Sequence, residues 1–393
     1  MNRAFVYQVA KSELLLLGRN WAFRVYALLL VAGIFSFHVA CQSTYGVYSW
    51  SMVALPSSIP YVNAFLLCLF QSFFIPFAVL DLWTRERGTA TLDAIRVHPE
   101  SNLEYIAGKF AGMGSGFALL SLVVMAAGMA VNGIASNAPF SFPVYMFYWF
   151  TLTLPSTVFM LALSFFIVFS LSNRWLSLLS LMILFFLTVT VLPGKRWDAF
   201  NFLATHQSNL FSPVMGHVDL KAYLLHRACF LFGGAGLFML TVCFSRRLFN
   251  RVSSPRFLSR LGGILLLVGF CFGWARDKSF REEQRARERY RAVYLEHEGE
   301  HTPRVKEHDI VFSNSGDELN LSSRLEVWNP TGKNLSRVVL YLNPFLKVNR
   351  VESGNKAVTF KREGQALVVD IPLPEGDSVV LEMDYSGKID ERV

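Results

Sequence analysis

The stretch DLWTRERGTATLDAIRVHPESNLEYIAGK, residues 81–109, carries four basic and five acidic residues, and the chain on both sides of it is almost entirely apolar. Of the 393 residues, 53% are hydrophobic and only 17% are charged, whereas about a quarter of the residues of a soluble domain are charged. An apolar excess of this size predicts a bilayer as the surrounding solvent. The sequence therefore predicts an α-helical polytopic membrane protein, with residues 81–109 as a charged segment between two spans.

Seven apolar runs approach or exceed the roughly 20 helical residues that are needed to cross the hydrocarbon core. They cover residues 21–41, 61–82, 110–131, 144–171, 175–192, 222–244 and 257–275. Arg260 lies inside the seventh run, so the uninterrupted apolar part of that run is only 261–275. Residues 4–17 are largely apolar but include Lys11 and Glu13, which predicts a helix in the membrane interface rather than a span.

The basic residues alternate between successive connections. The N-terminal segment and residues 83–109 contain several, whereas residues 42–60 and 134–142 contain no Lys or Arg. Because cytoplasmic loops collect basic residues, this pattern predicts a cytoplasmic N-terminus and a cytoplasmic 81–109 segment. The loop 193–221, which contains three basic residues, is an exception on the outer side. The net charge of +8 is thus explained by membrane orientation, and nucleic-acid binding is not expected.

The character of the chain changes after the seventh run. Residues 277–303 mix acidic and basic side chains at helical spacing, which predicts a charged helical stalk. Residues 304–393 contain strand-length apolar runs separated by turn sequences such as ESGN and REGQ, which predicts a small antiparallel, β-sandwich-like domain. The expected domains are a membrane domain over 1–250, a seventh span over 251–276, the stalk, and an extracytoplasmic β domain. The five cysteines lie in or beside apolar runs, and no disulfide framework is expected.

Residues 84–107 are predicted to form a folded elbow with its own short helix. Gly88 is expected to interrupt the chain, and Thr89 is a plausible N-cap for a helix over 90–98. Ser101 and Glu104 have the spacing of a capping box at the start of the next helix. A rigid polar helix in this place can dock a cytoplasmic partner or pack in the interface, and the residues alone leave both possibilities open.

The elbow resembles the cytoplasmic segment of ABC-2 type permeases, the membrane subunits of ATP-binding-cassette exporters. The matching residues are Arg85, Glu86, Gly88, Thr89, Leu92, Pro99, Ser101, Gly108 and Lys109. Asp93 departs from the pattern, because many family members have Glu at that position. The resemblance covers about residues 1–250 and implies two permease subunits, as a homodimer or paired halves, in a bacterial inner membrane. It assigns contact with the ATPase subunit to Arg85, Glu86, Gly88, Thr89, Leu92 and Asp93.

The chain has no GxxxxGK[ST] phosphate loop, so ATP is expected to be bound by a separate ATPase subunit. The segment HEGEH matches the zinc-peptidase pattern through His297, Glu298 and His301, but Gly299 and Pro303 are poor helix residues. We interpret this match as coincidental. The β domain, with its DYSGKI segment, resembles the N-terminal domain of M1-family aminopeptidases, as found in permease/aminopeptidase fusions. The zinc site of that family belongs to a later domain, so no peptidase activity is expected.

The sequence therefore favours a transporter permease subunit that is not itself an enzyme and contains no catalytic or metal-binding residues. One alternative is a membrane-anchored scaffold that presents its β domain to a partner such as a peptidase. The other is a zinc metallopeptidase that uses the HEGEH segment. No charged side chain is expected deep in the first six spans, and His226 and Arg227 are expected to snorkel or to pair with a loop. The substrate and the direction of transport are not encoded in any recognisable motif.

Overall fold

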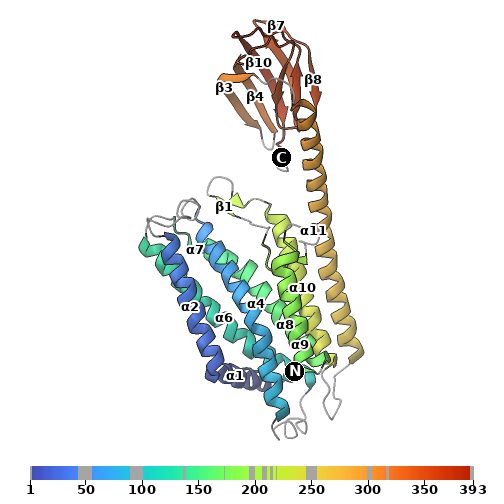
Figure 1. Ribbon diagram of the computed structural model, residues 1–393. Coiled ribbons are helices and arrows are strands. Elements are labelled where there is room, and N and C mark those ends of the chain that lie inside the picture. The colour runs from blue at the N-terminus through green and yellow to red at the C-terminus, as the bar shows by residue number, and fades with distance from the viewer. Residues whose placement is uncertain are drawn as a thin grey trace. The chain divides into compact units, whose positions relative to one another are not determined.

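The structure, a computed structural model, describes residues 2–42, 55–88, 101–135, 139–171, 173–193, 200–205, 210–212, 216–217, 219–244, 255–298, 303–315 and 318–389. The chain divides into two compact units, Met1–Ser279 and Phe280–Val393. The first unit is a helical bundle (Figure 1). The second unit combines the last part of helix α11 (Pro255–His297) with antiparallel sheets.

Helices make up most of the first unit, and the last of them continues into the second unit. They are α1 (Arg3–Arg19), α2 (Trp21–Gln42), α4 (Ser58–Gly88), α6 (Asn102–Ala135), α7 (Phe142–Tyr148), α8 (Leu154–Leu171), α9 (Arg174–Phe186), α10 (Leu220–Phe244) and α11 (Pro255–His297), with π-helical turns η1 (Trp149–Thr153) and η2 (Leu187–Val191). A short hairpin pairs β1 (Phe211–Ser212) with β2 (Gly216–His217). Within the described residues, seven segments are long and apolar enough to cross a membrane, in the predicted order. The expectation of seven helical segments of membrane-spanning length and composition is therefore confirmed, and it is consistent with a multi-pass membrane protein.

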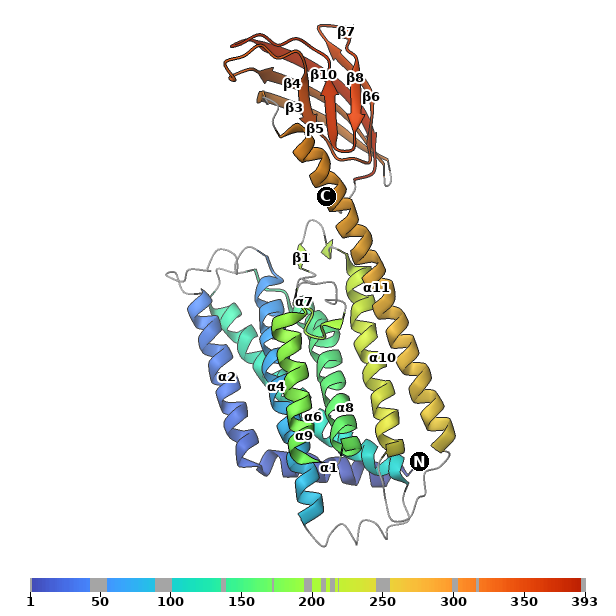
Figure 2. The ribbon, with the colours of Figure 1, turned by 45° about the vertical axis from the view of Figure 1, so that its right-hand side comes forward.

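Helix α1 lies across one end of the bundle, near the end of α4 and the start of α6 (Figure 2). We call this end of the bundle the α1 end. Three glycines of α6, spaced four residues apart, let α1 approach closely. A Cβ atom at Gly108 would lie 2.6 Å from Val9 Cβ, and one at Gly112 would lie 2.5 Å from Ala10 O. A Cβ atom at the third glycine, Gly116, would lie 2.6 Å from Leu17 Cδ2 of α1. Small residues at this spacing are what close helix packing in a bilayer requires.

The elbow differs from the prediction where the structure describes it. Helix α4 continues through Gly88 instead of ending near Leu82, and α6 begins at Asn102. The polar side chains of the last turns do not end α4, because they find partners: Arg85 pairs with Asp81 one turn earlier, and Glu86 pairs with a lysine of α6. The predicted short helix over 90–98 lies outside the described residues.

The fourth predicted span is not one regular helix. It runs as α7, η1 and α8, and the amide of Leu154 donates to Trp149 O, five residues back. Pro155 follows directly and has no N–H to donate to Thr151 O. The missing N–H of Pro155 leaves the Thr151 carbonyl without its helical hydrogen bond. This is the physical reason why the span widens into a π-helical turn here.

The predicted boundary between the seventh span and the stalk is also absent. Helix α11 is continuous over Pro255–His297, so the apolar run and the charged segment form one helix. Nothing in residues 276–280 breaks a helix, because that stretch contains no glycine or proline. The amino-acid composition changes there from apolar to charged, while the backbone remains helical.

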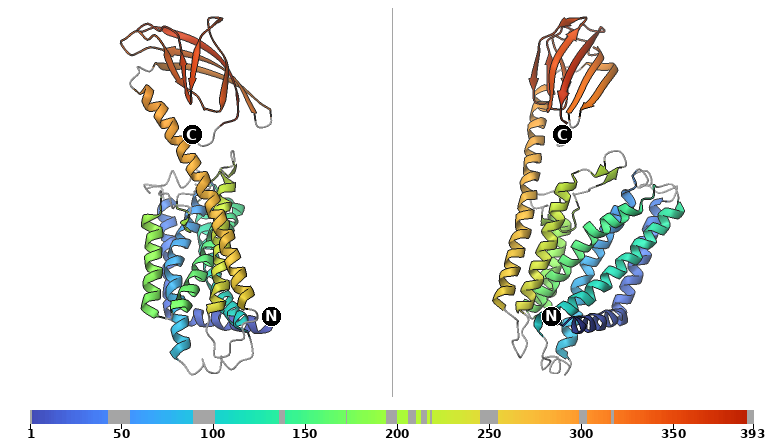
Figure 3. Two further views of the ribbon diagram at one scale, coloured as in Figure 1. Left: turned by 90° about the vertical axis from the view of Figure 1, so that its right-hand side faces the viewer. Right: turned by 180° about the vertical axis from the view of Figure 1, so that it is seen from behind.

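The second unit contains a five-stranded antiparallel sheet and a three-stranded one, seen from two sides in Figure 3. The larger sheet has the order β3-β4-β10-β6-β7 and the smaller one the order β5-β9-β8. The strands are β3 (Arg304–Ser315), β4 (Glu318–Trp328), β5 (Val338–Tyr341), β6 (Leu346–Ser353), β7 (Lys356–Ala357), β8 (Phe360–Glu363), β9 (Ala366–Val369) and β10 (Ser378–Gly387). Side chains from both sheets, among them Val327, Val338, Leu367 and Leu381, form one core.

The turn sequences predicted the hairpins well. The ESGN and REGQ segments connect β6 to β7 and β8 to β9, and Gly354 and Gly364 have the positive φ angles that such tight turns need. Strands β3 and β6 were not predicted. Strand β3 is exposed from Arg304 to Asn314, so its residues lack the alternation that a half-buried strand shows. Strand β6 carries several charged and polar residues within its run.

The glycine contacts generate a stability prediction. We expect Gly112→Ala to destabilise the first unit by roughly 1–3 kcal/mol, because the added methyl group meets the backbone of α1. The matched control is Gly114→Ala on the same helix, where the nearest atom is Leu161 Cδ2 at 3.6 Å. Thermal unfolding in detergent would compare the two variants. Equal unfolding temperatures would show that α1 does not depend on this close approach.

Candidate functional site

The α1 end contains a buried cluster of charged side chains. Lys109 Nζ lies 2.8 Å from Glu13 Oε1 and also forms an ion pair with Glu86. The hydroxyl of Tyr105 donates to Glu86 Oε1 at 2.9 Å, and the Lys109 ammonium lies 4.7 Å from the centre of the Tyr105 ring. The Lys109 side chain is only 3% exposed. These four residues, which we call the Lys109 cluster, connect α1, α4 and α6.

The beginning of α1 is attached to the beginning of α6. Asn2 caps α1 by accepting from Phe5 N, and its own backbone N–H donates to Glu104 Oε1 at 2.5 Å. The other oxygen of Glu104 accepts from the backbone N–H of Ser101 at 3.1 Å, while Ser101 Oγ accepts from Glu104 N at 3.3 Å. The predicted capping box is therefore confirmed, and the same glutamate also holds the N-terminus of α1.

The end of α1 is attached to α4. Asn20, the C-cap residue of α1, donates from Nδ2 to Asp81 Oδ2 at 2.9 Å. The same carboxylate oxygen lies 3.1 Å from Arg85 Nε. Together with the Lys109 cluster, α1 is held to its two neighbours at its start, middle and end. The helices that flank residues 89–100 are thus fixed to each other through α1.

The predicted site residues fall into two groups. Arg85, Glu86 and Gly88 belong to the last turns of α4, and the carboxylate of Glu86 is directed into the Lys109 cluster. Thr89, Leu92 and Asp93 lie outside the described residues. Sequence analysis identified Lys109 only as part of a motif and did not assign a partner to Glu13. The available signal was the only acidic residue of α1 and the only basic residue of α6, each in a largely apolar helix, where a charge is costly without a partner.

Arg227 of α10 is a second buried charge. The expectation that its side chain snorkels to the surface is wrong, because only 3% of the residue is exposed. Its side chain is buried and donates to four acceptors instead of reaching the surface. Nε donates to Thr151 O at 2.9 Å, Nη1 to Phe202 O at 3.0 Å, and Nη2 to Ser156 Oγ at 2.7 Å and Leu152 O at 3.4 Å. The bond to Thr151 O replaces the one that Pro155 cannot make. The bond to Phe202 O is the loop pairing that the sequence suggested.

The first histidine of the HEGEH segment contacts the β strands. His297 Nε2 lies 3.2 Å from Glu363 Oε2, and Lys361 Nζ lies 2.5 Å from the other oxygen of Glu363. The hydrogen bond from Lys361, and to a smaller extent that from His297, lowers the pKa of the Glu363 carboxyl group. His301 lies outside the described residues, and the described part of the chain contains no group of three or more His, Cys, Asp or Glu side chains that could hold a metal. His297 therefore attaches the end of α11 to β8.

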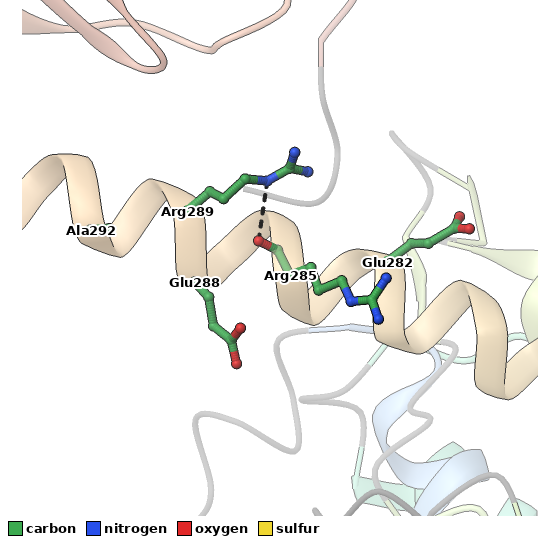
Figure 4. A pocket seen from close by; sticks show the side chains of 5 residues that line it. All are labelled: Glu282, Arg285, Glu288, Arg289 and Ala292. Carbon is green, nitrogen blue, oxygen red and sulfur yellow. Dashed lines mark hydrogen bonds between the residues drawn. The ribbon is translucent and has the colours of Figure 1, made fainter.

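The part of α11 in the second unit also presents an exposed charged surface. Figure 4 shows it, with a shallow depression lined by Glu282, Arg285, Glu288, Arg289 and Ala292. Arg289 Nε donates to the backbone oxygen of Arg285 at 3.3 Å. The described residues that line the depression contribute two carboxylates and two guanidinium groups, whose formal charges balance.

No protein-family model matches the chain, and no curated protein matches it either. Among solved structures, it is weakly similar to M1 zinc metallopeptidase variants. One from Deinococcus radiodurans, bound to a Tyr-Ser-Ala substrate, has a TM-score of 0.21 and 23% identity over 23% of this chain and 21% of that chain. A two-domain M1 metallopeptidase variant bound to L-tryptophan gives the same values. The chain thus spans about a fifth of the length of these structures, and the likeness assigns no activity to it.

The Lys109 cluster generates a second prediction. We expect Lys109→Met to destabilise the first unit by roughly 3–5 kcal/mol, because the carboxylates of Glu13 and Glu86, which are 9% and 16% exposed, lose their shared partner. The triple variant Lys109→Met, Glu13→Gln, Glu86→Gln should recover part of this loss. Arg85→Gln is the control, since its pair with Asp81 is well exposed and worth about 0–1 kcal/mol. Unfolding in detergent measures all three, and a Lys109→Met variant as stable as Arg85→Gln would contradict the role of the cluster.

Arg227 generates a third prediction. We expect Arg227→Lys to destabilise the bundle, because one ammonium group cannot reach acceptors on both the η1 region and the Phe202 loop. A buried carbonyl left without a donor costs about 1–3 kcal/mol. Arg174→Lys is the matched control, because Arg174 is exposed at the start of α9. If both substitutions lower the unfolding temperature equally, the four hydrogen bonds do not stabilise η1.

Proposed function

We propose that this chain is the permease subunit of an ABC-2 type transporter. It would move its substrate by alternating access, driven by a separate ATPase subunit that binds ATP. Support comes from the sequence resemblance of residues 84–109 to the ATPase-contacting segment of that family. Seven segments of membrane-spanning length and composition agree with such a subunit. A second permease subunit and the lipid bilayer are the other expected partners.

The observation that carries this proposal is the fixed attachment of the two helices that flank residues 89–100. Helix α4 leads into that segment and α6 leads out of it, and the Lys109 cluster joins both to α1. A push on the segment would therefore move three helices together instead of bending one loop. Motion of packed helices as a unit is how a local contact becomes a larger rearrangement.

The described residues suggest a division of roles within the proposed coupling segment. Glu86 is engaged with Lys109 and Tyr105, so we assign it a positioning role behind the contact surface. Arg85 and Gly88 complete the last turns of α4, and Thr89, Leu92 and Asp93 follow as the proposed contact residues. By the distribution of basic residues, this end would face the cytoplasm of a bacterial cell and the β unit would lie outside.

The test is native purification of the tagged full chain in mild detergent, with mass spectrometry of the proteins that accompany it. We expect an ATPase with a phosphate-loop sequence to accompany the parent chain and to be lost from Leu92→Asp. The control is Val311→Asp on strand β3, where the parent side chain is 74% exposed. That variant should retain the ATPase, because it changes only the β unit.

Each result separates the candidate functions. If no ATPase accompanies the chain, or if it remains with Leu92→Asp, the permease proposal fails. If a different partner is lost from Val311→Asp and retained by Leu92→Asp, the chain is better described as a membrane-anchored scaffold. The exposed apolar residues of β3, which include Ile310, Val311 and Phe312, are the observation that keeps this second candidate in view.

A further inference from the structure

Two polar side chains face a small cavity inside the first unit. Asn63 of α4 and Thr153 of η1 are each only 1% exposed. Met125 of α6, Tyr145 of α7 and Trp149 of η1 are among the residues that complete its wall. The cavity leaves about 10 Å³ for the centre of a water-sized sphere. It is therefore large enough for one water molecule and too small for most solutes.

The polar atoms of Asn63 and Thr153 that face this cavity lack a protein hydrogen bond of ordinary geometry. Within the described part of the chain, Asn63 Oδ1, Asn63 Nδ2 and Thr153 Oγ1 are buried and make no hydrogen bond. The imidazole of His38 lies beside the Asn63 amide, and the Cys68 thiol lies beside the Thr153 hydroxyl, but neither contact has the geometry of an ordinary hydrogen bond. Buried amide and hydroxyl groups nearly always have a partner in native proteins. A ligand in the cavity would supply a partner to all three atoms.

The polar atoms of the aromatic side chains in the cavity wall are already paired. Trp149 Nε1 donates to Ser121 Oγ at 2.8 Å, and the Tyr145 hydroxyl donates to Gly128 O at 3.4 Å. The open positions are thus confined to Asn63 and Thr153. An amide offers one acceptor and two donors, and a hydroxyl offers both functions. The complementary ligand is neutral and must donate and accept hydrogen bonds at once.

We propose that this cavity is a binding site for a single water molecule, which bridges the Asn63 amide and the Thr153 hydroxyl. The water joins α4 to η1 at a place where the side chains form no direct hydrogen bond. Ordered waters with two to four polar partners are normal constituents of protein interiors. This proposal does not depend on the proposed transport function.

The test is hydroxyl-radical labelling of the full chain by X-ray irradiation in heavy-oxygen water, with mass spectrometry of the labelled residues. A bound water releases radicals beside its neighbours, so we expect labelling of Met125 and Tyr145, which are buried, and of Trp149, which is partly buried. Met113 and Met160 are buried methionines away from the cavity and serve as internal references. Their labelling should remain at background.

Variants of the two polar residues test whether the labelling of Met125 depends on them. We expect labelling of Met125 to fall to the level of Met113 in Asn63→Leu and in Thr153→Val. Thr153→Val keeps the shape of the side chain, so the test survives if Asn63→Leu fails to fold. The matched control is Thr188→Val, because Thr188 is also buried in a π-helical turn but donates to Leu184 O. Thr188→Val should leave the label on Met125 unchanged.

Two results would overturn the proposal. Labelling of Met125, Tyr145 and Trp149 no stronger than that of Met113 and Met160 would show that the cavity is dry. Labelling that persists in both Asn63→Leu and Thr153→Val would show that water reaches these residues without the two polar groups. Loss of the label in both variants, with the label retained in Thr188→Val, supports the site.

Discussion

The ammonium group of Lys109, held between the carboxylates of Glu13 and Glu86, is the interaction on which the first unit depends. A charge in an apolar interior is tolerated only when it is paired and hydrogen-bonded. Because the partners come from α1 and α4, pairing this one side chain fixes the positions of three helices. Close approach of α1 requires the glycines of α6, among them Gly108 and Gly112, where any side chain would meet its backbone or side chains.

The same constraint governs the rest of the bundle. Where water is scarce, every polar group must find its partner inside the protein. Pro155 leaves a backbone carbonyl unpaired, and Arg227 of another helix supplies the donor. Among the described residues, none forms a hydrogen bond of ordinary geometry with the Asn63 amide or the Thr153 hydroxyl, and the proposed water molecule would supply that bond. A few specific polar contacts thus decide how otherwise similar apolar helices are matched.

The second unit is organised by ordinary strand pairing and a shared apolar core. Its link to the membrane part is a single continuous helix, α11, whose end is attached to the small sheet by His297, Tyr290 and Val293. This attachment gives His297 a structural partner in Glu363. The proposed transporter function concerns the α1 end of the first unit. A partner of the β unit would bind a different surface, such as the exposed strand β3.

The number and order of the seven apolar segments, the capping box at Ser101 and the hairpin turns were determined by the sequence, because each depends on local composition and short-range spacing. Local spacing did not predict the continuation of α4 to Gly88, since a partner more than twenty residues away, Lys109, stabilises Glu86 in that helix. The role of Arg227 was decided by tertiary structure for the same reason, because its four acceptors lie on residues far from it in the sequence. A buried charge or an unpaired carbonyl takes its partner from whichever helix packs beside it, and a single sequence does not say which helix that is.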